Sequence, residues 1–421
     1  MKYLIKNAKV ITPFRELDNT DILVKDGLID KIGVHLASED SIIVDATDCI
    51  VIPGLIDIHT HGAGGCDVMD LSLEAFKTIS TYKVKMGCTS FLPTSLSCSF
   101  DNLKRLLEIF KDIYDKKMYK KWNGAYMIGL NIEGPFISGE MRGAQPVEYI
   151  YAPTKEMGKY LLNFSKYIKI ITMAPEIPAV LELATQLRNA GVLISIGHSD
   201  ATFEDVLVAL EHGFSHVTHI YSAMSTVRRI NLLRVPGVIE AAYLFDDLTV
   251  EMIADGKHLP PSLMKLIIEK KPLDKIIAIT DSMRAAGMQE GKYKIGGEKD
   301  GFDVIVEDGV AKLIDRTAFA GSVARVDDLL RNLVNLVKID IPTATRLLTV
   351  NPAKELGIFP RKGIINIGSD ADLVVLDAKL NVVMTLVEGN IAFQYSNYAC
   401  VKSSSSTKNE QIHRSKLSGT I

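Results

Sequence analysis

The sequence is poor in features that mark several specialised classes of protein. Its five cysteines have no CxxC spacing, and a chain of 421 residues does not need disulfides to hold its core together. We therefore expect reduced cysteines and a cytoplasmic location. No segment approaches the roughly 20 apolar residues of a membrane helix, so no membrane partner is expected. Lys6, Asn7 and Lys9 interrupt the first apolar residues, which argues against a signal peptide.

The chain also lacks an excess of charge of either sign. Its 48 Lys and Arg side chains nearly balance 51 Asp and Glu, which leaves a formal net charge of −3, and no long run of like charges occurs. A protein without a basic surplus is not expected to bind nucleic acid. Apolar residues, by contrast, make up 47% of the chain, which is enough for one large domain and a smaller one.

Short stretches typical of β-strands lie at both ends of the chain. Near the beginning they are YLIKNAKVI, DILVKDGLIDKI and CIVIP, and residues 363 to 394 have the same character. Because the ends of a compact domain often lie close together, we expect residues 1–53 and 363–399 to form one small β-sandwich domain. Residues 400–421 are polar and aperiodic, so a disordered tail is expected there.

Between these ends, short apolar stretches alternate with longer amphipathic ones, which is typical of βα units around a buried parallel sheet. The eight expected strands are 56–61, 89–94, 125–133, 168–176, 192–198, 216–220, 249–255 and 275–281. Helices are expected at 100–117 and 179–190, a strand pair within 293–318, and closing helices at 323–337 and 342–349. Eight such units predict an α/β fold in which residues 54–362 form a (β/α)8, TIM-like barrel.

Residues able to bind a metal or carry a proton gather at the carboxyl ends of these strands. They are His59, His61, Glu133, His198, His219 and Asp281. In such barrels this rim is where active sites are built. His59 and His61 are two apart on one strand, so both rings point to the same face, and the glycines that follow leave room beside them. The alternative for an isolated pair of this kind is local hydrogen bonding.

Glu133, His198 and His219 form a His2Glu set, which recurs in catalytic zinc sites that keep one position open for water. Glu133 ends an apolar strand, and a carboxylate there needs a cation to offset its burial. The alternatives are a salt bridge from Glu133 to Arg142 and structural roles for the two histidines. His216, three residues before His219, points to the other side of its strand and is interpreted as packing.

Asp281 follows the last expected strand and can act as a further ligand or as a general base. A bound metal lowers the pKa of water to roughly 7, so that a nearby carboxylate can accept its proton. Four of the five candidate ligands are histidines and none is cysteine. This set favours one or two ions of Zn²⁺ or Fe²⁺ over Mg²⁺ or Ca²⁺.

Short motifs surround the candidate residues and continue along the chain. They are PGLIDIHTHG (53–62), IEGPF (132–136), MAPE (173–176), GHSDA (197–201), THIYSAM (218–224), IADGKH (253–258), ITDSM (279–283) and AGS (320–322). Together they resemble the N-acetylglucosamine-6-phosphate deacetylase group of the amidohydrolase superfamily. The resemblance implies that Glu133, His198 and His219 bind the principal metal.

The same resemblance assigns the rest of the site. His59 and His61 match a variant that holds a second metal, and Asp281 matches the catalytic acid and base. The positions that match substrate contacts are Ala144, Gln145, Ser222, Ala223, His258 and Ser322. Arg234, which precedes a Pro-Gly pair, matches the phosphate ligand, and Arg228 and Arg229 are further candidates in a segment longer than expected.

The resemblance implies hydrolysis of N-acetylglucosamine 6-phosphate, in amino-sugar catabolism, by a homodimer. The alternatives left open are a related phosphorylated N-acetylhexosamine, such as N-acetylgalactosamine 6-phosphate, and another small amide. A cyclic amide or dipeptide hydrolase would need a lysine at the end of the fourth strand, where the sequence is MAPE (173–176). A scaffold protein without activity would have lost ligands, whereas every ligand position is filled here.

Overall fold

The computed structural model describes residues 2–396 and 401–402 of the 421-residue chain. The tail expected at 400–421 therefore lies outside the described residues, apart from β25 (Val401–Lys402). This short strand pairs antiparallel with β4 (Ile42–Asp45). The backbone of these two residues extends a sheet formed by the amino-terminal strands, and disorder of the tail as a whole stays a prediction.

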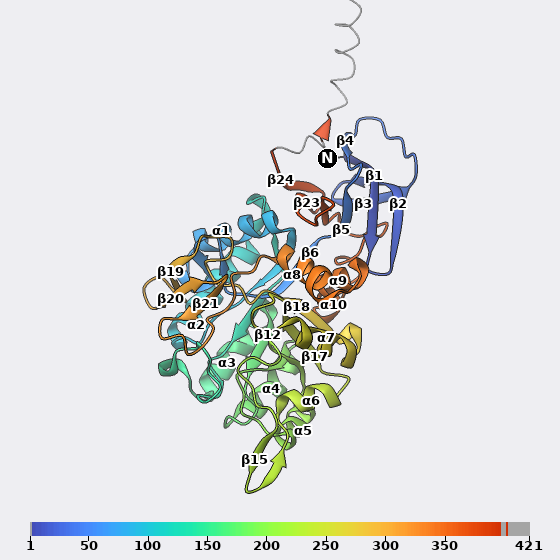
Figure 1. The fold of residues 1–421 in the computed structure, drawn as a ribbon. Coiled ribbons are helices and arrows are strands. Elements are labelled where there is room, and N and C mark those ends of the chain that lie inside the picture. The colour runs from blue at the N-terminus through green and yellow to red at the C-terminus, as the bar shows by residue number, and fades with distance from the viewer. Residues whose placement is uncertain (1, 397–400, 403–421) are drawn as a thin grey trace, which may run out of the picture.

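Eight parallel strands follow one another through the middle of the chain (Figure 1). They are β6 (Leu55–Thr60), β9 (Cys88–Pro93), β11 (Leu130–Glu133), β12 (Ile168–Met173), β13 (Leu193–Ile196), β14 (Phe214–Val217), β17 (Thr249–Ile253) and β18 (Ile276–Ile279). Each overlaps an expected strand, and β10 (Tyr126–Met127) is the separated first part of the third. Most of their residues are buried, as expected for strands covered on both faces.

Hydrogen bonds arrange these strands in two sheets, β10–β9–β6 and β11–β12–β13–β14–β17–β18. Single parallel bridges join the sheets at both edges, from Thr94 to Asn131 and from Thr60 to Ser282. The backbone N–H of His61 also donates to the carbonyl of Ser282, 2.8 Å away. Since neighbouring strands run parallel, their carboxyl ends all lie on one side of this curved layer.

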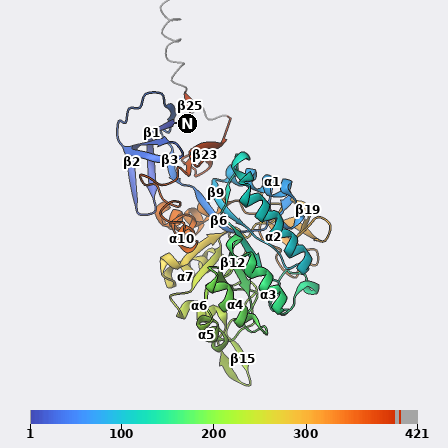
Figure 2. The ribbon, with the colours of Figure 1, turned by 180° about the vertical axis from the view of Figure 1, so that it is seen from behind.

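A helix follows each of the eight strands. They are α1 (Leu73–Lys83), α2 (Phe100–Asp115), α3 (Lys155–Asn163), α4 (Val180–Asn189), α5 (Phe203–Glu211), α6 (Val238–Leu244), α7 (Pro261–Lys270) and α8 (Val326–Asn332). Figures 1 and 2 show the helices along the outer side of the curved sheets, and helices and strands share the largest apolar cluster. No helix in the described part of the chain is long and apolar enough to cross a membrane.

Local sequence explains where these helices begin. The hydroxyl of Ser72 accepts a hydrogen bond from the backbone of Ala75 and caps α1. Thr202 and Asp205 form a capping box at the start of α5, in which each side chain accepts from the other's backbone N–H. Such caps satisfy N–H groups that the first turn of a helix leaves without partners.

Two regions near the end of the parallel strands differ from the sequence prediction. The segment 293–318 holds three antiparallel strands rather than a pair: β19 (Gly291–Ile295), β20 (Phe302–Glu307) and β21 (Val310–Leu313). The helix expected at 323–337 is α8 followed by a π-helical turn, Leu333–Val337. The closing helices are α9 (Ile341–Leu348) and α10 (Val350–Glu355).

The sequence analysis also missed a hairpin between β14 and α6. It consists of β15 (Arg228–Ile230) and β16 (Leu233–Val235) and projects from the rest of the molecule (Figure 1). Its two turn residues, Asn231 and Leu232, have φ of 45° and 70°. This geometry suits a two-residue hairpin turn, which the sequence usually marks by Asn followed by Gly. Here Leu232 stands where Gly is usual, so the sequence does not indicate the turn.

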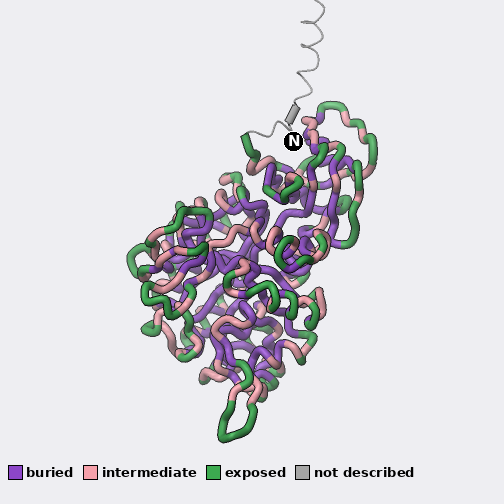
Figure 3. Tube along the Cα trace, in the orientation of Figure 1, coloured by how far each residue is buried: buried purple, intermediate pink, exposed green. Residues whose placement is uncertain are grey.

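The two ends of the chain meet in a separate nine-stranded sheet with the order β24–β23–β22–β5–β1–β2–β3, from which β4 and β25 branch. The strands not yet named are β1 (Lys2–Thr12), β2 (Arg15–Lys25), β3 (Leu28–Gly33), β5 (Ile50–Pro53), β22 (Leu373–Leu376), β23 (Val382–Val387) and β24 (Asn390–Gln394). The sheet branches because β1 pairs first with β4 and then with β5. Its apolar side chains form their own buried cluster, and Figure 3 shows that interior as buried.

Candidate active site

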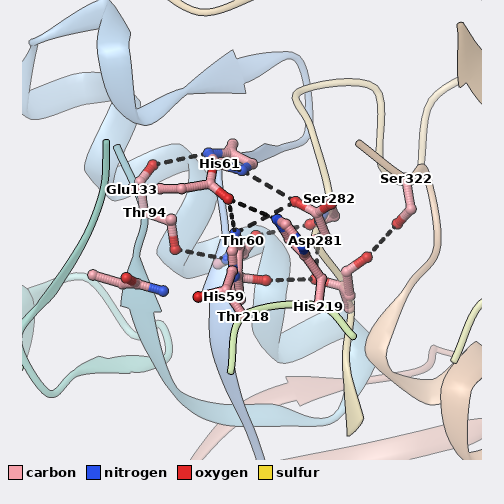
Figure 4. A network of polar contacts seen from close by, with 12 residues as sticks. His59, Thr60, His61, Thr94, Glu133, Thr218, His219, Asp281, Ser282 and Ser322 are labelled. Carbon is pink, nitrogen blue, oxygen red and sulfur yellow. Dashed lines mark hydrogen bonds and ion pairs between the residues drawn. The ribbon is translucent and has the colours of Figure 1, made fainter. Parts of the chain in front are cut away.

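Side chains from five of the parallel strands converge at the carboxyl side of the sheet (Figure 4). They are His59 in β6, His61 just after it, Glu133 at the end of β11, and His198, His219 and Asp281, each two residues beyond β13, β14 and β18. All of them are buried. The structure therefore brings together every candidate ligand and the candidate acid and base.

Three of these residues have an unusual backbone conformation. His198, His219 and Asp281 have φ of 49°, 29° and 48°, a region that residues other than glycine rarely occupy. Each lies where the chain leaves a strand, and the turn directs the side chain back over the strand ends. Such strain clusters at functional sites, where the surrounding structure holds it in place.

Glu133 is the centre of the first group of contacts. Its Oε1 lies 2.9 Å from Nε2 of His219, 3.1 Å from Nε2 of His198 and 3.4 Å from Nε2 of His59. Its Oε2 accepts a hydrogen bond from Nε2 of Gln145 at 2.6 Å. One carboxylate thus meets three imidazoles, which is the arrangement expected of ligands that share a cation.

Asp281 is the centre of the second group. Its Oδ1 lies 3.1 Å from Nε2 of His61 and 3.5 Å from Nε2 of His59. His61 also approaches Glu133, at 3.4 Å from Oε2, so the two groups are adjacent. Figure 4 shows His59, His61 and His219 gathered with the two carboxylates.

The ring nitrogens of the histidines fit a metal site. Nδ1 of His59 lies 2.9 Å from the carboxylate of Glu251. Nδ1 of His61 lies 3.3 Å from the carbonyl of Thr94, and Nδ1 of His198 lies 2.9 Å from the carbonyl of Met141. An acceptor at Nδ1 fixes the proton there and leaves the Nε2 lone pair free for a ligand bond, as in most metal-binding histidines.

The donor atoms are also close enough to share ions. Two sets of three residues share His59, and in each set the ligand atoms lie within 4.8 Å of one another. The first set adds His61 and Asp281 to His59, and the second adds Glu133 and His219. Nε2 of His59 is buried without a hydrogen-bond partner, which a coordinated cation would explain. The residues present therefore fit a divalent metal, as expected from the sequence.

Electrostatics keep both carboxylates ionised. Burial acts to raise the pKa of Glu133, but the charges and hydrogen bonds of His59, His198 and His219 outweigh it and hold this pKa well below its usual value. Burial likewise acts to raise the pKa of Asp281, and the hydrogen bond from His61 is the main cause of its net decrease. Asp281 is thus available as a proton acceptor at neutral pH.

Glu251 in β17 is a contact that the sequence analysis missed. Its Oε2 lies 2.9 Å from Nδ1 of His59 and 3.1 Å from the backbone nitrogen of His219. His216, interpreted as packing, lies on its other side with Nε2 3.3 Å from Oε1. The signal for Glu251 was a lone acidic residue inside the apolar strand TVEMI, where burial of a charge requires a partner.

A pocket of about 280 Å³ opens beside the cluster. Of the residues that resemble substrate contacts, those that line it are Ala144, Gln145, Ser222, Ala223 and His258. His258 is fixed by Asp255, with Nδ1 2.7 Å from Oδ2, and its ring lies 4.8 Å from that of Phe319. No arginine or lysine is among the described residues that line this pocket.

The remaining three candidates lie elsewhere. Ser322 is buried behind the pocket, where its hydroxyl donates to the carbonyl of Thr280 at 2.6 Å and its N–H to that of Asp281 at 2.7 Å. Arg228, at the base of the hairpin, is paired with Asp200. Arg234 is exposed on β16.

Histidine and carboxylate side chains at the carboxyl ends of parallel βα strands, beside a pocket of small-molecule size, are typical of a metal-dependent hydrolase. The family model described as "Amidohydrolase family" matches residues 50–392, and the chain belongs to this family.

Known relatives narrow the class further. The chain is 35% identical to the N-acetylglucosamine-6-phosphate deacetylase of Bacillus subtilis (strain 168), over 93% of this chain and 97% of the relative. It is 28% identical to the N-acetylgalactosamine-6-phosphate deacetylase of Escherichia coli O157:H7, over 93% and 100%. The crystal structure of N-acetylglucosamine-6-phosphate deacetylase from Pasteurella multocida superposes with a TM-score of 0.85 at 28% identity, covering 93% of this chain and 99% of that one.

Proposed function

We propose that this chain is a metal-dependent deacetylase that hydrolyses N-acetylglucosamine 6-phosphate to glucosamine 6-phosphate and acetate. The observation that carries the proposal is the convergence of four histidines, Glu133 and Asp281 beside one pocket. The relative with 35% identity is named for this activity, whereas the relative named for the galactosamine substrate is 28% identical. We therefore favour the glucosamine derivative as the substrate.

Glu133, His198 and His219 would hold the principal ion, and His59 and His61 a second one. We propose Zn²⁺ or Fe²⁺, because imidazole-rich sets favour these ions. When bound, such an ion supplies Lewis acidity that polarises the acetamide carbonyl and lowers the pKa of a water to roughly 7.

Asp281 is the proposed catalytic residue. Its ionised carboxylate accepts a proton from the water that attacks the acetamide carbonyl carbon, and His61, 3.1 Å away, keeps the carboxylate in place. Asp281 then delivers the proton to the amide nitrogen as the C–N bond breaks. Acetate and the free amino sugar phosphate leave the pocket.

The pocket residues Ala144, Gln145, Ser222, Ala223 and His258 are the proposed sugar contacts. Gln145 is held by two hydrogen bonds, from Ser97 to its Oε1 and from its Nε2 to Glu133, so its position is fixed before substrate arrives. This fixed geometry supports a role in orienting the acetamide.

Recognition of the phosphate is the proposed role of Arg234 in a homodimer. No arginine is among the described residues that line the pocket, and the projecting hairpin carries Arg229 and Arg234 as cross-strand partners. Leu232 and Leu233 beside them are 80% and 71% exposed. Exposed apolar residues in one place are typical of an interaction surface, so we propose that the hairpin of one subunit reaches the pocket of another.

We also propose that the two parallel sheets close into one (β/α)8 barrel of residues 54–362. The bridges at both edges and the likeness to the Pasteurella multocida structure support this closure. A small sandwich domain of residues 1–53 and 363–399 is supported by its separate apolar cluster. A cytoplasmic location remains part of the proposal, supported by five cysteines without CxxC spacing in a chain of this length.

The test is acetate release from a panel of N-acetylglucosamine 6-phosphate, N-acetylgalactosamine 6-phosphate and the two unphosphorylated sugars. The account predicts the highest kcat/KM for N-acetylglucosamine 6-phosphate. A ratio near one between phosphorylated and free sugar would mean that phosphate is not recognised, and that the substrate is another small amide.

A further inference from the structure

Glu251 joins two segments that carry metal-ligand candidates. It is fully buried in β17, and its Oε2 contacts both the ring of His59 in β6 and the backbone N–H of His219 beyond β14. Glu251 is not among the described residues that line the pocket, and it contacts Nδ1 of His59, whereas Glu133 and Asp281 lie near Nε2.

We propose that Glu251 is a positioning residue that holds His59 and His219 in the orientation in which their Nε2 atoms can bind a divalent ion. The inference rests on the proposed function insofar as it requires ions in this site. It concerns binding of the metal and is independent of the identity of the substrate.

The first argument is the orientation of the His59 ring. Only one of its nitrogens can face the cluster, and the acceptor at Nδ1 determines that this is Nε2. Nε2 lies between Glu133 and Asp281, 3.4 and 3.5 Å from their nearest oxygens. Without Glu251 the ring would lose the bond that fixes both its tautomer and its rotation.

The second argument is the backbone of His219. Its φ of 29° lies in a sparsely populated region, so the conformation needs support from its surroundings. The bond from the His219 N–H to Glu251 provides that support, and Nε2 of His219 then reaches Oε1 of Glu133 at 2.9 Å.

The carboxylate of Glu251 is itself held from behind. Nε2 of His216 lies 3.3 Å from Oε1, and Nδ1 of His216 lies 3.0 Å from Oε1 of Glu355. Glu251 therefore presents Oε2 to the ligands and Oε1 to His216. This division of the two oxygens allows variants that separate geometry from charge.

Three variants make the test. Glu251→Met removes both acceptors at similar volume. Glu251→Gln can keep its amide oxygen at the Oε2 position, facing His59 and His219, while its NH2 group faces His216. Glu355→Gln is the matched control, since it changes a partly buried carboxylate that contacts His216 but neither His59 nor His219.

The measurement is Zn²⁺ stoichiometry and affinity, by elemental analysis and competition with a chelator, after the bound metal is stripped. We expect two ions in the wild type, and about 10- to 100-fold weaker binding of at least the ion that needs His59 in Glu251→Met. Glu251→Gln and Glu355→Gln should bind as the wild type does. If Glu251→Met does not fold, Glu251→Asp, whose acceptor is withdrawn by one methylene, takes its place with the same expectation.

Wild-type affinity for both ions in Glu251→Met would overturn the proposal, and so would a wild type that binds a single ion. Equal weakening in Glu251→Gln would show that charge, not orientation, matters, and equal weakening in Glu355→Gln would show a general loss of structure. A wild type that binds two ions but releases no acetate from the sugar phosphates would contradict the proposed function alone.

Discussion

Asp281, the proposed catalytic residue, is held in place by hydrogen bonds of its own backbone. Its backbone N–H donates to the carbonyl of His59 at 3.0 Å, and its carbonyl accepts from the N–H of Ser322 at 2.7 Å. These bonds hold a residue whose φ is 48°, and the carboxylate meets His61. The proposed acid and base is therefore fixed by its own turn and by its neighbours.

Replacing Asp281 with Asn keeps the shape of the side chain and removes its basicity. Because Glu133, His198 and His219 are untouched, the principal ion should stay bound while kcat falls about 10²-fold or more. Metal content by elemental analysis and turnover by acetate release check both halves. Turnover near that of the wild type would assign Asp281 a structural role.

Single residues also show the limit of reading the sequence. The HxH spacing and the positions at strand ends were enough to predict all six residues that converge, because strand period and strand direction determine where they point. Glu251 could not be predicted as their neighbour. It contacts His59 and His219, which lie 192 and 32 residues away in the chain. Only the arrangement of the folded strands, in which β17 lies beside β14, brings these residues together.

At the scale of elements, the β15–β16 hairpin separates Arg234 from the pocket of its own chain. The sequence does not signal the turn at Asn231 and Leu232, so it predicts only that this segment supplies the phosphate ligand. The structure instead pairs Arg228 with Asp200 and leaves Arg229 and Arg234 on opposite strands of the hairpin.

If Arg234 binds the phosphate, Arg234→Ala should lower kcat/KM for N-acetylglucosamine 6-phosphate by the equivalent of about 1.5 to 3 kcal/mol, as for a charged hydrogen-bond pair. Turnover of the unphosphorylated sugar should hardly change. Arg229→Ala, which removes the same charge from the neighbouring strand, is the control. An equal loss for both sugars, or in both variants, would exclude a specific contact from Arg234 to the phosphate.

Helix α10 and strand β14 are linked by a partly buried ion pair, His216 with Glu355. Burial acts to lower the pKa of His216, but hydrogen bonds to Glu251 and Glu355 outweigh it and raise this pKa to about 9. Burial acts to raise the pKa of Glu355, and the hydrogen bond from His216 is the main cause of its net decrease.

The stabilisation from this pair should depend on pH. The contribution of His216 is complete below its unfolded pKa of 6.5 and is lost as pH rises through about 9, whereas that of Glu355 is complete above 4.5 and is lost at lower pH. Both contributions are complete between pH 4.5 and pH 6.5. Glu355→Gln should therefore lower the free energy of unfolding most in this pH range, by about 1.5 to 3 kcal/mol. Denaturant unfolding across the pH range checks this, and a difference that does not vary with pH would contradict it.

For the whole molecule, alternation of apolar strands and amphipathic helices predicted the order of the parallel strands, because burial on both faces leaves a clear mark in sequence. The terminal sheet was harder. Some of its paired strands, such as β5 and β22, come from segments more than 300 residues apart. The sheet also branches at β1, because one part of β1 pairs with β4 and the next part pairs with β5.

Metal should stabilise the folded chain as a whole, since the site joins five strands that are far apart in sequence. Ions that bind only the folded state add about 2.7 kcal/mol of stability at a free concentration 100-fold above Kd. Thermal unfolding with and without chelator should show a lower Tm for the stripped protein. Identical curves would mean that the cluster does not bind an ion under those conditions.

The most direct test of the account couples the metal to the reaction. Acetate release from N-acetylglucosamine 6-phosphate is measured for the stripped wild type, for the same protein after addition of Zn²⁺ or Fe²⁺, and for Glu133→Ala treated identically. The account predicts no turnover without metal, recovery in the wild type, and neither metal binding nor recovery in the variant. Full turnover by the stripped wild type, or by Glu133→Ala, would contradict it.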